Sequence, residues 1–224
     1  MDSKNGKINA AQTALDFIKP GMIIGLGTGS TSAFFIKALS LLVKDGLKIK
    51  AVASSISSYL LASSLGIKMV EDREVEMLDL TVDGADEIDQ NKQMIKGGGG
   101  ALLREKILAS ISREMIVIAD ETKKVTHLGK FPLPVEIASF AYKATLKQLE
   151  AHGFFPSLRK KEGNLFYTDN GNLIADLKFQ GLIKDPEMEN RKLKSIPGVL
   201  ETGLFLNMAK KVIIGHADGS VEII

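Results

Sequence analysis

The amino-acid sequence predicts an α/β fold, in which helices cover a parallel sheet and a smaller α+β unit is inserted. In residues 1–129, short apolar runs alternate with segments of helical periodicity, as expected for a parallel sheet with crossover helices. Residues 130–203 instead follow the order strand, helix, strand, strand, helix, strand, which is typical of a ferredoxin-like α+β unit. We expect residues 204–224 to return to the first domain.

The elements of the first domain follow one another at short intervals. Apolar residues at helical spacing predict a first helix that ends before Pro20-Gly21, and an apolar run at 22–26 then leads into a glycine-rich turn. The helix after this turn ends near Gly46. Further strands are expected at 49–53, 67–70, 77–82 and 115–119, and further helices at 57–64 and 101–111.

The inserted unit contains a clear helix start. Asp185 suits the N-cap and Pro186 the first helical position. The expected strands are 135–140, 155–159, 173–179 and 199–204, with a second helix at 143–152. A hairpin of 212–214 and 221–224 closes the chain.

Composition excludes several classes of function. The chain has 224 residues and a net charge of +2, which gives no electrostatic footprint for nucleic acid. It has no cysteine, so disulfides, thiol catalysis and cysteine-based metal sites are excluded, and its three scattered histidines do not predict a metal site. No apolar run approaches the roughly 18 residues of a membrane span, and the polar N-terminus does not resemble a signal peptide. We therefore expect a cytoplasmic protein.

The first stretch with chemical potential is the turn at 25–31, between a strand and a helix. Its glycines allow backbone amides to approach an anion, the helix N-terminus adds a favourable partial charge, and Ser30 and Thr31 add hydroxyl donors. A dinucleotide fingerprint would require glycine at position 30 or 32, and both residues are serine. The turn therefore predicts phosphate binding, with a turn that binds no ligand as the alternative.

The second stretch places four carboxylates within seven residues at the end of a predicted strand. These are Asp83, Asp86, Glu87 and Asp89. Buried and ionised together they would repel one another, so they need cations, backbone donors or solvent. The carboxyl end of a parallel strand is where such sheets bind ligands, although a solvated acidic loop remains the alternative.

The third stretch is the glycine run 97–100. Four consecutive glycines suit a nest of backbone amides that binds an anion or oxyanion at the start of the next helix. The core stripe of that helix is expected to be Leu103, Ile107 and Ile111, which directs Glu105 toward solvent. By the same default Lys7, Lys96 and Lys123 would be surface residues.

Three motifs together resemble the type A ribose-5-phosphate isomerase family: GLGTGSTS at 25–32, VDGADEID at 82–89 and KGGGGALLREK at 96–106. The likeness continues through 128–136, 168–172 and 196–205, and so covers nearly the whole chain. It implies a Rossmann-like catalytic domain, residues 1–129 and 204–224, with a ferredoxin-like lid or dimerisation domain, residues 130–203.

The resemblance also implies an activity and a set of site residues. The activity is the interconversion of D-ribose 5-phosphate and D-ribulose 5-phosphate without metal or cofactor, in a homodimer or a dimer of dimers. Glu105 of the Arg-Glu-Lys triplet would be the proton-transferring base, against its predicted exposure, with Asp83, Asp86 and Lys96 as further catalytic residues. The substrate-binding positions implied are Thr28, Gly29, Ser30, Thr31, Asp83, Gly84, Ala85, Asp86, Lys96, Gly97, Gly98, Gly99, Lys123 and Lys7. The alternative is a sugar-phosphate-binding regulatory protein on the same fold.

Overall fold

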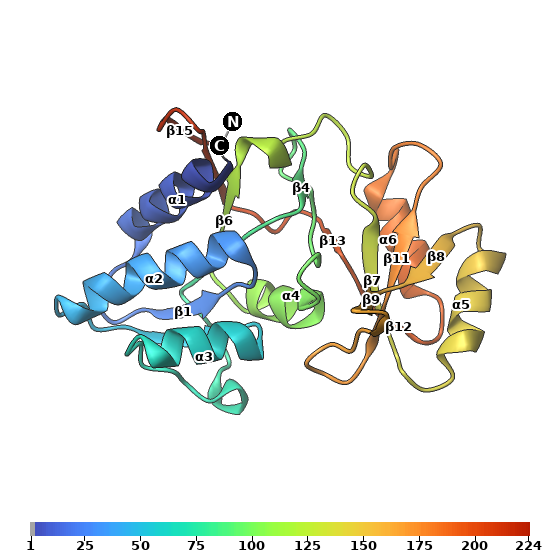
Figure 1. Ribbon diagram of the computed structural model, residues 1–224, viewed down its shortest axis with the longest axis horizontal. Helices are drawn as coiled ribbons and strands as arrows, with labels where there is room; N and C mark the ends of the chain where they lie inside the picture. The colour runs from blue at the N-terminus through green and yellow to red at the C-terminus, as the bar shows by residue number, and fades with distance from the viewer. Residues whose placement is uncertain (1–2) are drawn as a thin grey trace. The chain divides into compact units, whose positions relative to one another are not determined.

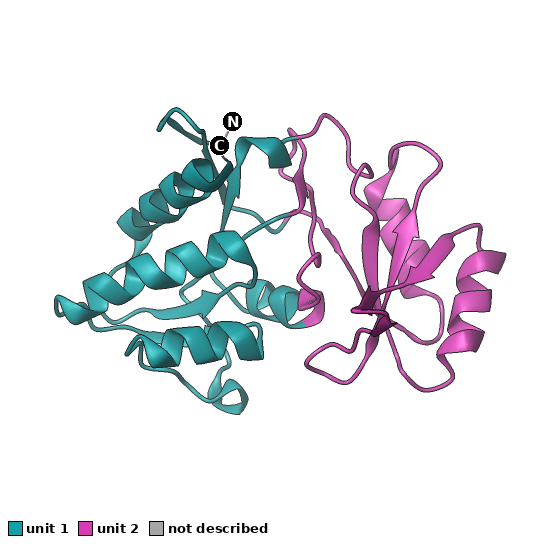
Figure 2. Ribbon diagram, viewed as in Figure 1, with its two compact units in different colours: residues 1–85, 104–124, 208–224 teal, residues 86–103, 125–207 magenta. Residues whose placement is uncertain are grey.

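The computed structural model describes residues 3–224, which form two compact units (Figure 2). The first contains residues up to 85 together with 104–124 and 208–224, and the second contains residues 86–103 and 125–207. The sequence-based division placed 86–103, 125–129 and 204–207 in the first domain. All three segments belong to the second unit, in which β5 (Met94–Ile95) pairs with β13 (Leu204–Phe205) and Glu87 accepts the amide of Gly129.

The first unit is built on a six-stranded sheet, as the alternating pattern predicted. The strand order is β15-β14-β6-β3-β1-β2, and all pairs are parallel except that of β14 with the C-terminal β15. The strands are β1 (Ile23–Leu26), β2 (Lys50–Ala53), β3 (Leu80–Asp83), β6 (Met115–Asp120), β14 (Lys211–Gly215) and β15 (Val221–Ile223). The predicted strand at 67–70 is reduced to an isolated bridge between Ala51 and Met69.

Helices cover both faces of this sheet. The α-helices, labelled in Figure 1, are α1 (Ser3–Thr13), α2 (Ser30–Lys44), α3 (Ile56–Ser64) and α4 (Leu102–Ser110). Ile24 and Leu26 of β1 pack in one buried cluster with residues of α1, α2 and α3. Ile23, which points to the opposite face, packs in another cluster with Leu108 of α4. Short 3₁₀ helices η1 (Ala14–Phe17), η2 (Asp72–Glu74) and η3 (Glu121–Lys123) complete the unit.

The second unit has the predicted ferredoxin-like topology. Its four-stranded sheet is antiparallel, in the order β12-β7-β11-β8. The elements are β7 (Leu133–Ile137), α5 (Tyr142–Ala151), β8 (Phe155–Leu158), β11 (Leu173–Lys178), α6 (Pro186–Lys194) and β12 (Val199–Thr202). The Asp185 side chain accepts a hydrogen bond from the amide of Met188 (2.9 Å), which confirms the predicted helix start.

The hydrophobic periodicity of the sequence does not predict the shortest strands. β4 (Glu87–Ile88), β5 and β13 form a three-stranded sheet, and β9 (Lys160–Lys161) pairs with β10 (Asn164–Leu165) in a small hairpin. Two-residue strands are too short to show alternation, so only tertiary pairing defines them. None of the helices within residues 3–224 is long and apolar enough to cross a membrane.

Candidate active site

The glycine-rich turn connects the end of β1 to the start of α2, as predicted. Gly29 immediately precedes α2 with φ of 105°, a conformation that favours glycine. At Gly27 the constraint is space, because an added Cβ would lie 1.9 Å from Oδ1 of Asp83. The turn thus lies at the N-terminus of a 15-residue helix. The partial positive charge at this end of a helix favours the binding of an anion.

Polar side chains from other elements of the first unit meet this turn. Nζ of Lys7, on α1, donates a hydrogen bond to Oγ of Ser30 (3.2 Å). The Thr28 and Ser54 hydroxyls are hydrogen-bonded at 2.8 Å. The structure therefore brings Lys7 to the predicted phosphate turn, although the two are more than twenty residues apart in sequence.

Asp83, at the end of β3, is bound to the same turn. Its Oδ1 accepts hydrogen bonds from the amides of Thr28 (3.1 Å) and Gly84 (2.7 Å) and from the Ser32 hydroxyl (3.3 Å). The carboxylate reaches the turn because β3 and β1 are parallel neighbours. Asp83 is fully buried. Asp83 therefore orders the backbone that is predicted to bind phosphate.

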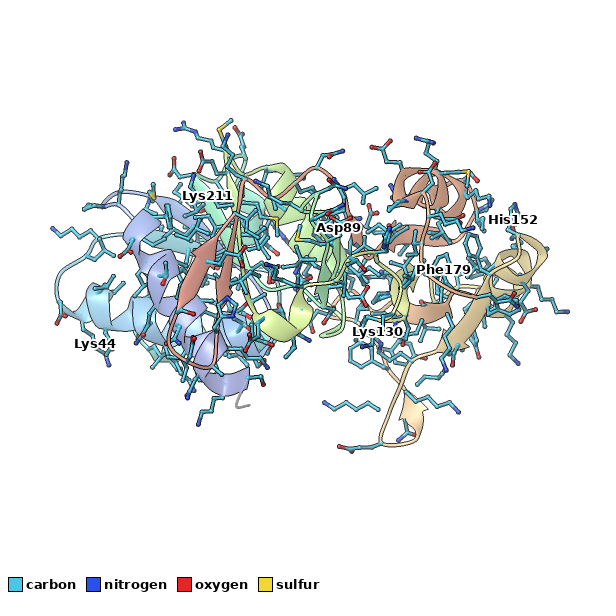
Figure 3. The ribbon with its side chains drawn as sticks, turned by 90° about the horizontal axis from the view of Figure 1, so that it is seen from above. Lys44, Asp89, Lys130, His152, Phe179 and Lys211 are labelled. Atoms are coloured by element: carbon cyan, nitrogen blue, oxygen red, sulfur yellow. The ribbon has the colours of Figure 1, made fainter. Side chains whose placement is uncertain are left out.

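The other carboxylates of the acidic stretch also bind backbone amides. Oδ2 of Asp86 accepts the amide of Gly98 (2.7 Å), and Oε2 of the buried Glu87 accepts that of Gly129 (2.8 Å). Asp89, labelled in Figure 3, accepts two amides of the turn that follows it. From the sequence, these carboxylates could be stabilised by cations, by backbone donors or by solvent. In the structure each of the four accepts at least one hydrogen bond from a backbone amide. The stretch is thus no simple solvated loop.

The glycine run forms a tight turn. The amide of Gly100 donates to the carbonyl of Gly97 (3.0 Å), and both residues have positive φ, 104° at Gly97 and 82° at Gly100. The turn is also closely packed, since a Cβ on Gly100 would lie 2.5 Å from the Phe166 ring. Positive φ at both positions therefore favours glycine here, before any ligand is considered.

Glu105 and Lys96 are buried, contrary to the surface positions that the residues alone predicted. Glu105 is 3% exposed and Lys96 is 2% exposed. Nζ of Lys96 lies 5.2 Å from the centroid of the Phe205 ring, a cation–π distance.

The predicted core stripe of α4 was wrong at Ile107, which explains the error for Glu105; Leu103 is half-buried and Ile111 packs against a buried cluster. Ile107 is 49% exposed, whereas Leu102 and Leu108 are buried on either side of Glu105. Positions 102, 105 and 108 lie one helical turn apart on one face, so the helix buries Glu105 with its leucines. The helical wheel assumed that the most apolar residues face the core, whereas α4 buries the carboxylate Glu105 and exposes Ile107.

Lys123 ends η3, just beyond β6, and is half-buried. Next to it on η3, Oε2 of Glu121 lies 2.9 Å from Nδ1 of His216, which follows β14. The hydrogen bond with His216 is the main cause of a lowered Glu121 pKa, and the amide of Ala217 adds to it. This pair ties the segment that carries Lys123 to the C-terminal hairpin.

Sequence reasoning missed Arg159 and Asp176. They form an ion pair in the second unit, and Nη1 of Arg159 donates to the carbonyls of Gly97 (2.7 Å) and Gly98 (3.1 Å). Arg159 lies 62 residues from Gly97 in the chain, so no local spacing could have revealed the contact.

The candidate residues are distributed over both units. The first unit holds Lys7, Thr28, Gly29, Ser30, Thr31, Asp83, Gly84, Ala85, Glu105 and Lys123, and the second holds Asp86, Lys96, Gly97, Gly98 and Gly99. The chain passes between units within the acidic motif, after Ala85, and again just before the Arg104-Glu105 pair.

A parallel α/β sheet with a glycine-rich turn at a helix N-terminus, and a buried glutamate and lysine on either side of a glycine run in sequence, are the features expected of an enzyme for a small phosphorylated substrate. The sequence model of the family "Ribose 5-phosphate isomerase A (phosphoriboisomerase A)" matches residues 50–219. The chain belongs to this family.

Similar proteins agree over the full length. A ribose-5-phosphate isomerase A of Protochlamydia amoebophila is 53% identical, over 99% of this chain and 96% of the relative. The enzyme of the same name from Bacillus mycoides is 51% identical, over 97% and 99%. Among solved structures, a D-ribose-5-phosphate isomerase in complex with phospho-erythronic acid has a TM-score of 0.94 and 40% identity, and covers 100% of this chain and 99% of that one.

Proposed function

We infer that the protein is an aldose–ketose isomerase that interconverts D-ribose 5-phosphate and D-ribulose 5-phosphate, a reaction of the pentose phosphate pathway. The observation that carries this conclusion is the buried Glu105 on the helix that follows the glycine run, in a chain whose full-length relatives bear this enzyme's name. The roles of individual residues are our proposal, as follows.

Glu105 acts as the base. It removes the proton from C2 of the open-chain aldose, which leaves a cis-enediolate with the negative charge on O1. It then returns the proton to C1, while the O2 proton moves to O1 and O2 becomes the ketone oxygen. One carboxylate can serve both carbons because they are adjacent. Burial of Glu105 supports this role, since reduced access of bulk water strengthens the electrostatic interactions within a site.

Lys96 and the amides of Gly97 and Gly99 stabilise the negative charge on the enediolate oxygens, while the Gly98 amide binds Asp86. Donors that are already in position act most strongly where water is excluded, and Lys96 is almost completely buried. The tight packing of the glycine run supports the same role, because its amides need not be ordered during the reaction.

The phosphate is bound by the turn from Thr28 to Thr31, with Lys7 and Lys123. The contact of Lys7 with Ser30 and the N-terminus of α2 support this assignment. Binding the phosphate far from the reacting carbons supplies energy that orients C1 and C2. The bound ligand of the structural relative, a phosphorylated hydroxy acid, has the chemistry that such a site requires.

We assign different roles to the two aspartates of the acidic motif. Asp83 already accepts three hydrogen bonds through Oδ1 and is fully buried, so its main role is to order the phosphate turn. Asp86 is half-buried and contacts the amide of Gly98, which suits binding of sugar hydroxyls and proton transfer in ring opening. Gly84 and Ala85 contribute backbone contacts to the sugar.

The assembly and location remain predictions. We propose a homodimer or a dimer of dimers, with the second unit as its lid or dimerisation domain, as the family resemblance implies. Light scattering after gel filtration tests this, and a monomer would contradict it. A cytoplasmic location follows from a charged substrate that does not cross bilayers.

The test of the activity is formation of ribulose 5-phosphate from ribose 5-phosphate, with EDTA present and no cofactor added. Turnover is expected under these conditions. A folded protein that binds the sugar phosphate without converting it would contradict the assignment and favour a regulatory protein on this fold.

A further inference from the structure

The guanidinium of Arg159 connects the sheet of the second unit to the glycine run. Arg159 follows β8 and Asp176 lies on the neighbouring β11. Nε of Arg159 donates to Oδ2 of Asp176 (2.9 Å) and Nη2 donates to Oδ1, which makes a two-point ion pair. Nη1 then donates to the carbonyls of Gly97 (2.7 Å) and Gly98 (3.1 Å).

The two carbonyl contacts determine where the following amides point. In a trans peptide the C=O and the next N–H point in opposite directions. Because both carbonyls point to Arg159, the amides of Gly98 and Gly99 point away from it. The structure agrees for Gly98, whose amide donates to Asp86 at 2.7 Å on the opposite side of the peptide.

The arrangement has the features of a support that holds the glycine run in place. Only 15% of the Arg159 side chain and 25% of that of Asp176 is exposed, so solvent screens the pair weakly. The same segment supplies Phe166, whose amide donates to the carbonyl of Arg159 (3.0 Å) and whose ring occupies the space beside Gly100. Arginine suits this position because its planar fork can bind a carboxylate and two carbonyls at once, which lysine cannot do.

We propose that Arg159, held by Asp176, is a positioning residue that keeps the Gly98 amide on Asp86 and orients the Gly99 amide toward the enediolate oxyanion. The proposal deepens the proposed function and rests on it. Arg159 does not touch the substrate in this account. It acts through the peptide planes, and its hydrogen bonds to the carbonyls also polarise the amides that follow.

The test compares Arg159→Lys and Arg159→Met with the control Lys194→Met, which removes a different ion pair of the second unit, 2.9 Å to Glu201. For each variant we would measure kcat, KM, Tm, and the affinities for phospho-erythronic acid and for inorganic phosphate. The phosphorylated acid carries a carboxylate that resembles the enediolate, whereas phosphate probes only the glycine-rich turn at 25–31.

Both Arg159 variants are expected to lower kcat about 10- to 100-fold with KM within about threefold, since a misplacement of about 1 Å can cost 10²-fold. Affinity for phospho-erythronic acid should fall by a similar factor while phosphate affinity is unchanged. Arg159→Lys should have a Tm close to that of wild type but a lowered kcat, and Lys194→Met should keep the wild-type kcat.

Two results would overturn the proposal. One is a kcat within about twofold of wild type in folded Arg159→Lys and Arg159→Met. The other is a parallel loss of Tm, phosphate affinity and kcat that lysine fully rescues, which would indicate a merely structural ion pair. Failure of the proposed function itself is recognised separately, as wild-type protein without turnover. The two affinities then still decide whether Arg159 orients the amides.

Discussion

Replacing Gly27 by alanine tests the link between Asp83 and the phosphate turn. The new Cβ would lie 1.9 Å from Oδ1, 2.1 Å from Cγ and 2.6 Å from Cβ of Asp83. Rotation of the aspartate side chain cannot relieve the contact with its own Cβ, so the backbone must move. The move separates the carboxylate from the amide of Thr28 and the hydroxyl of Ser32. Each hydrogen bond to an ionised acceptor contributes about 1.5–3 kcal/mol, so we expect a destabilisation of about 3–6 kcal/mol.

Gly84→Ala is the matched control, because Gly84 binds the same carboxylate from the other side. Its added Cβ would find no atom nearer than the Ile118 carbonyl oxygen at 3.8 Å, so stability should change by less than about 1 kcal/mol. Since the chain has no tryptophan, urea unfolding is followed by far-UV circular dichroism, and the midpoints are compared at constant slope. Equal midpoints for the two variants would refute the steric reasoning.

Three further predictions concern charged groups. Lys123→Ala should raise KM about tenfold, equivalent to about 1.4 kcal/mol, with kcat little changed, and an unchanged KM would remove Lys123 from the phosphate site. Lys96→Met should lower kcat about 10²-fold or more while phosphate affinity is kept, and wild-type kcat would contradict its role at the oxyanion. The pKa of Glu121 is lowered by its hydrogen bond with His216, so the pair stabilises the fold above the ordinary pKa of 4.5, and this stabilisation is lost as the pH falls through the lower folded value. The Tm of wild type should therefore exceed that of Glu121→Gln at pH 7, and this difference in Tm should disappear in strong acid. A difference in Tm that does not change with pH would contradict the assignment.

Local rules predicted the elements that have strong local signals. Asp185 and Pro186 start a helix because capping is decided by neighbouring residues, and Gly29 follows a strand at the start of a helix because the turn needs its backbone conformation. The alternation of apolar runs with helices likewise gave the parallel sheet, and the βαββαβ order gave the antiparallel one. These features depend on residues close together in sequence.

What the sequence could not predict depends on distant contacts. The burial of Glu105 follows from the packing of α4, and a helical wheel that ranks faces by apolarity gives the opposite answer. Arg159 reaches Gly97 across 62 residues, and Lys7 reaches Ser30 across 23, so no local pattern contains either contact. Only the family resemblance identified Glu105 and Lys7 in advance, and it did not identify Arg159.

The most direct test of the central claim follows the proton that Glu105 is proposed to move. Ribose 5-phosphate is incubated in D₂O with wild type and with Glu105→Gln, and deuterium at C1 and C2 is followed by proton NMR. Wild type should exchange these positions as it isomerises the sugar, and Glu105→Gln should do so about 10²- to 10⁴-fold more slowly while still binding inorganic phosphate. Exchange by Glu105→Gln at the wild-type rate would contradict the account.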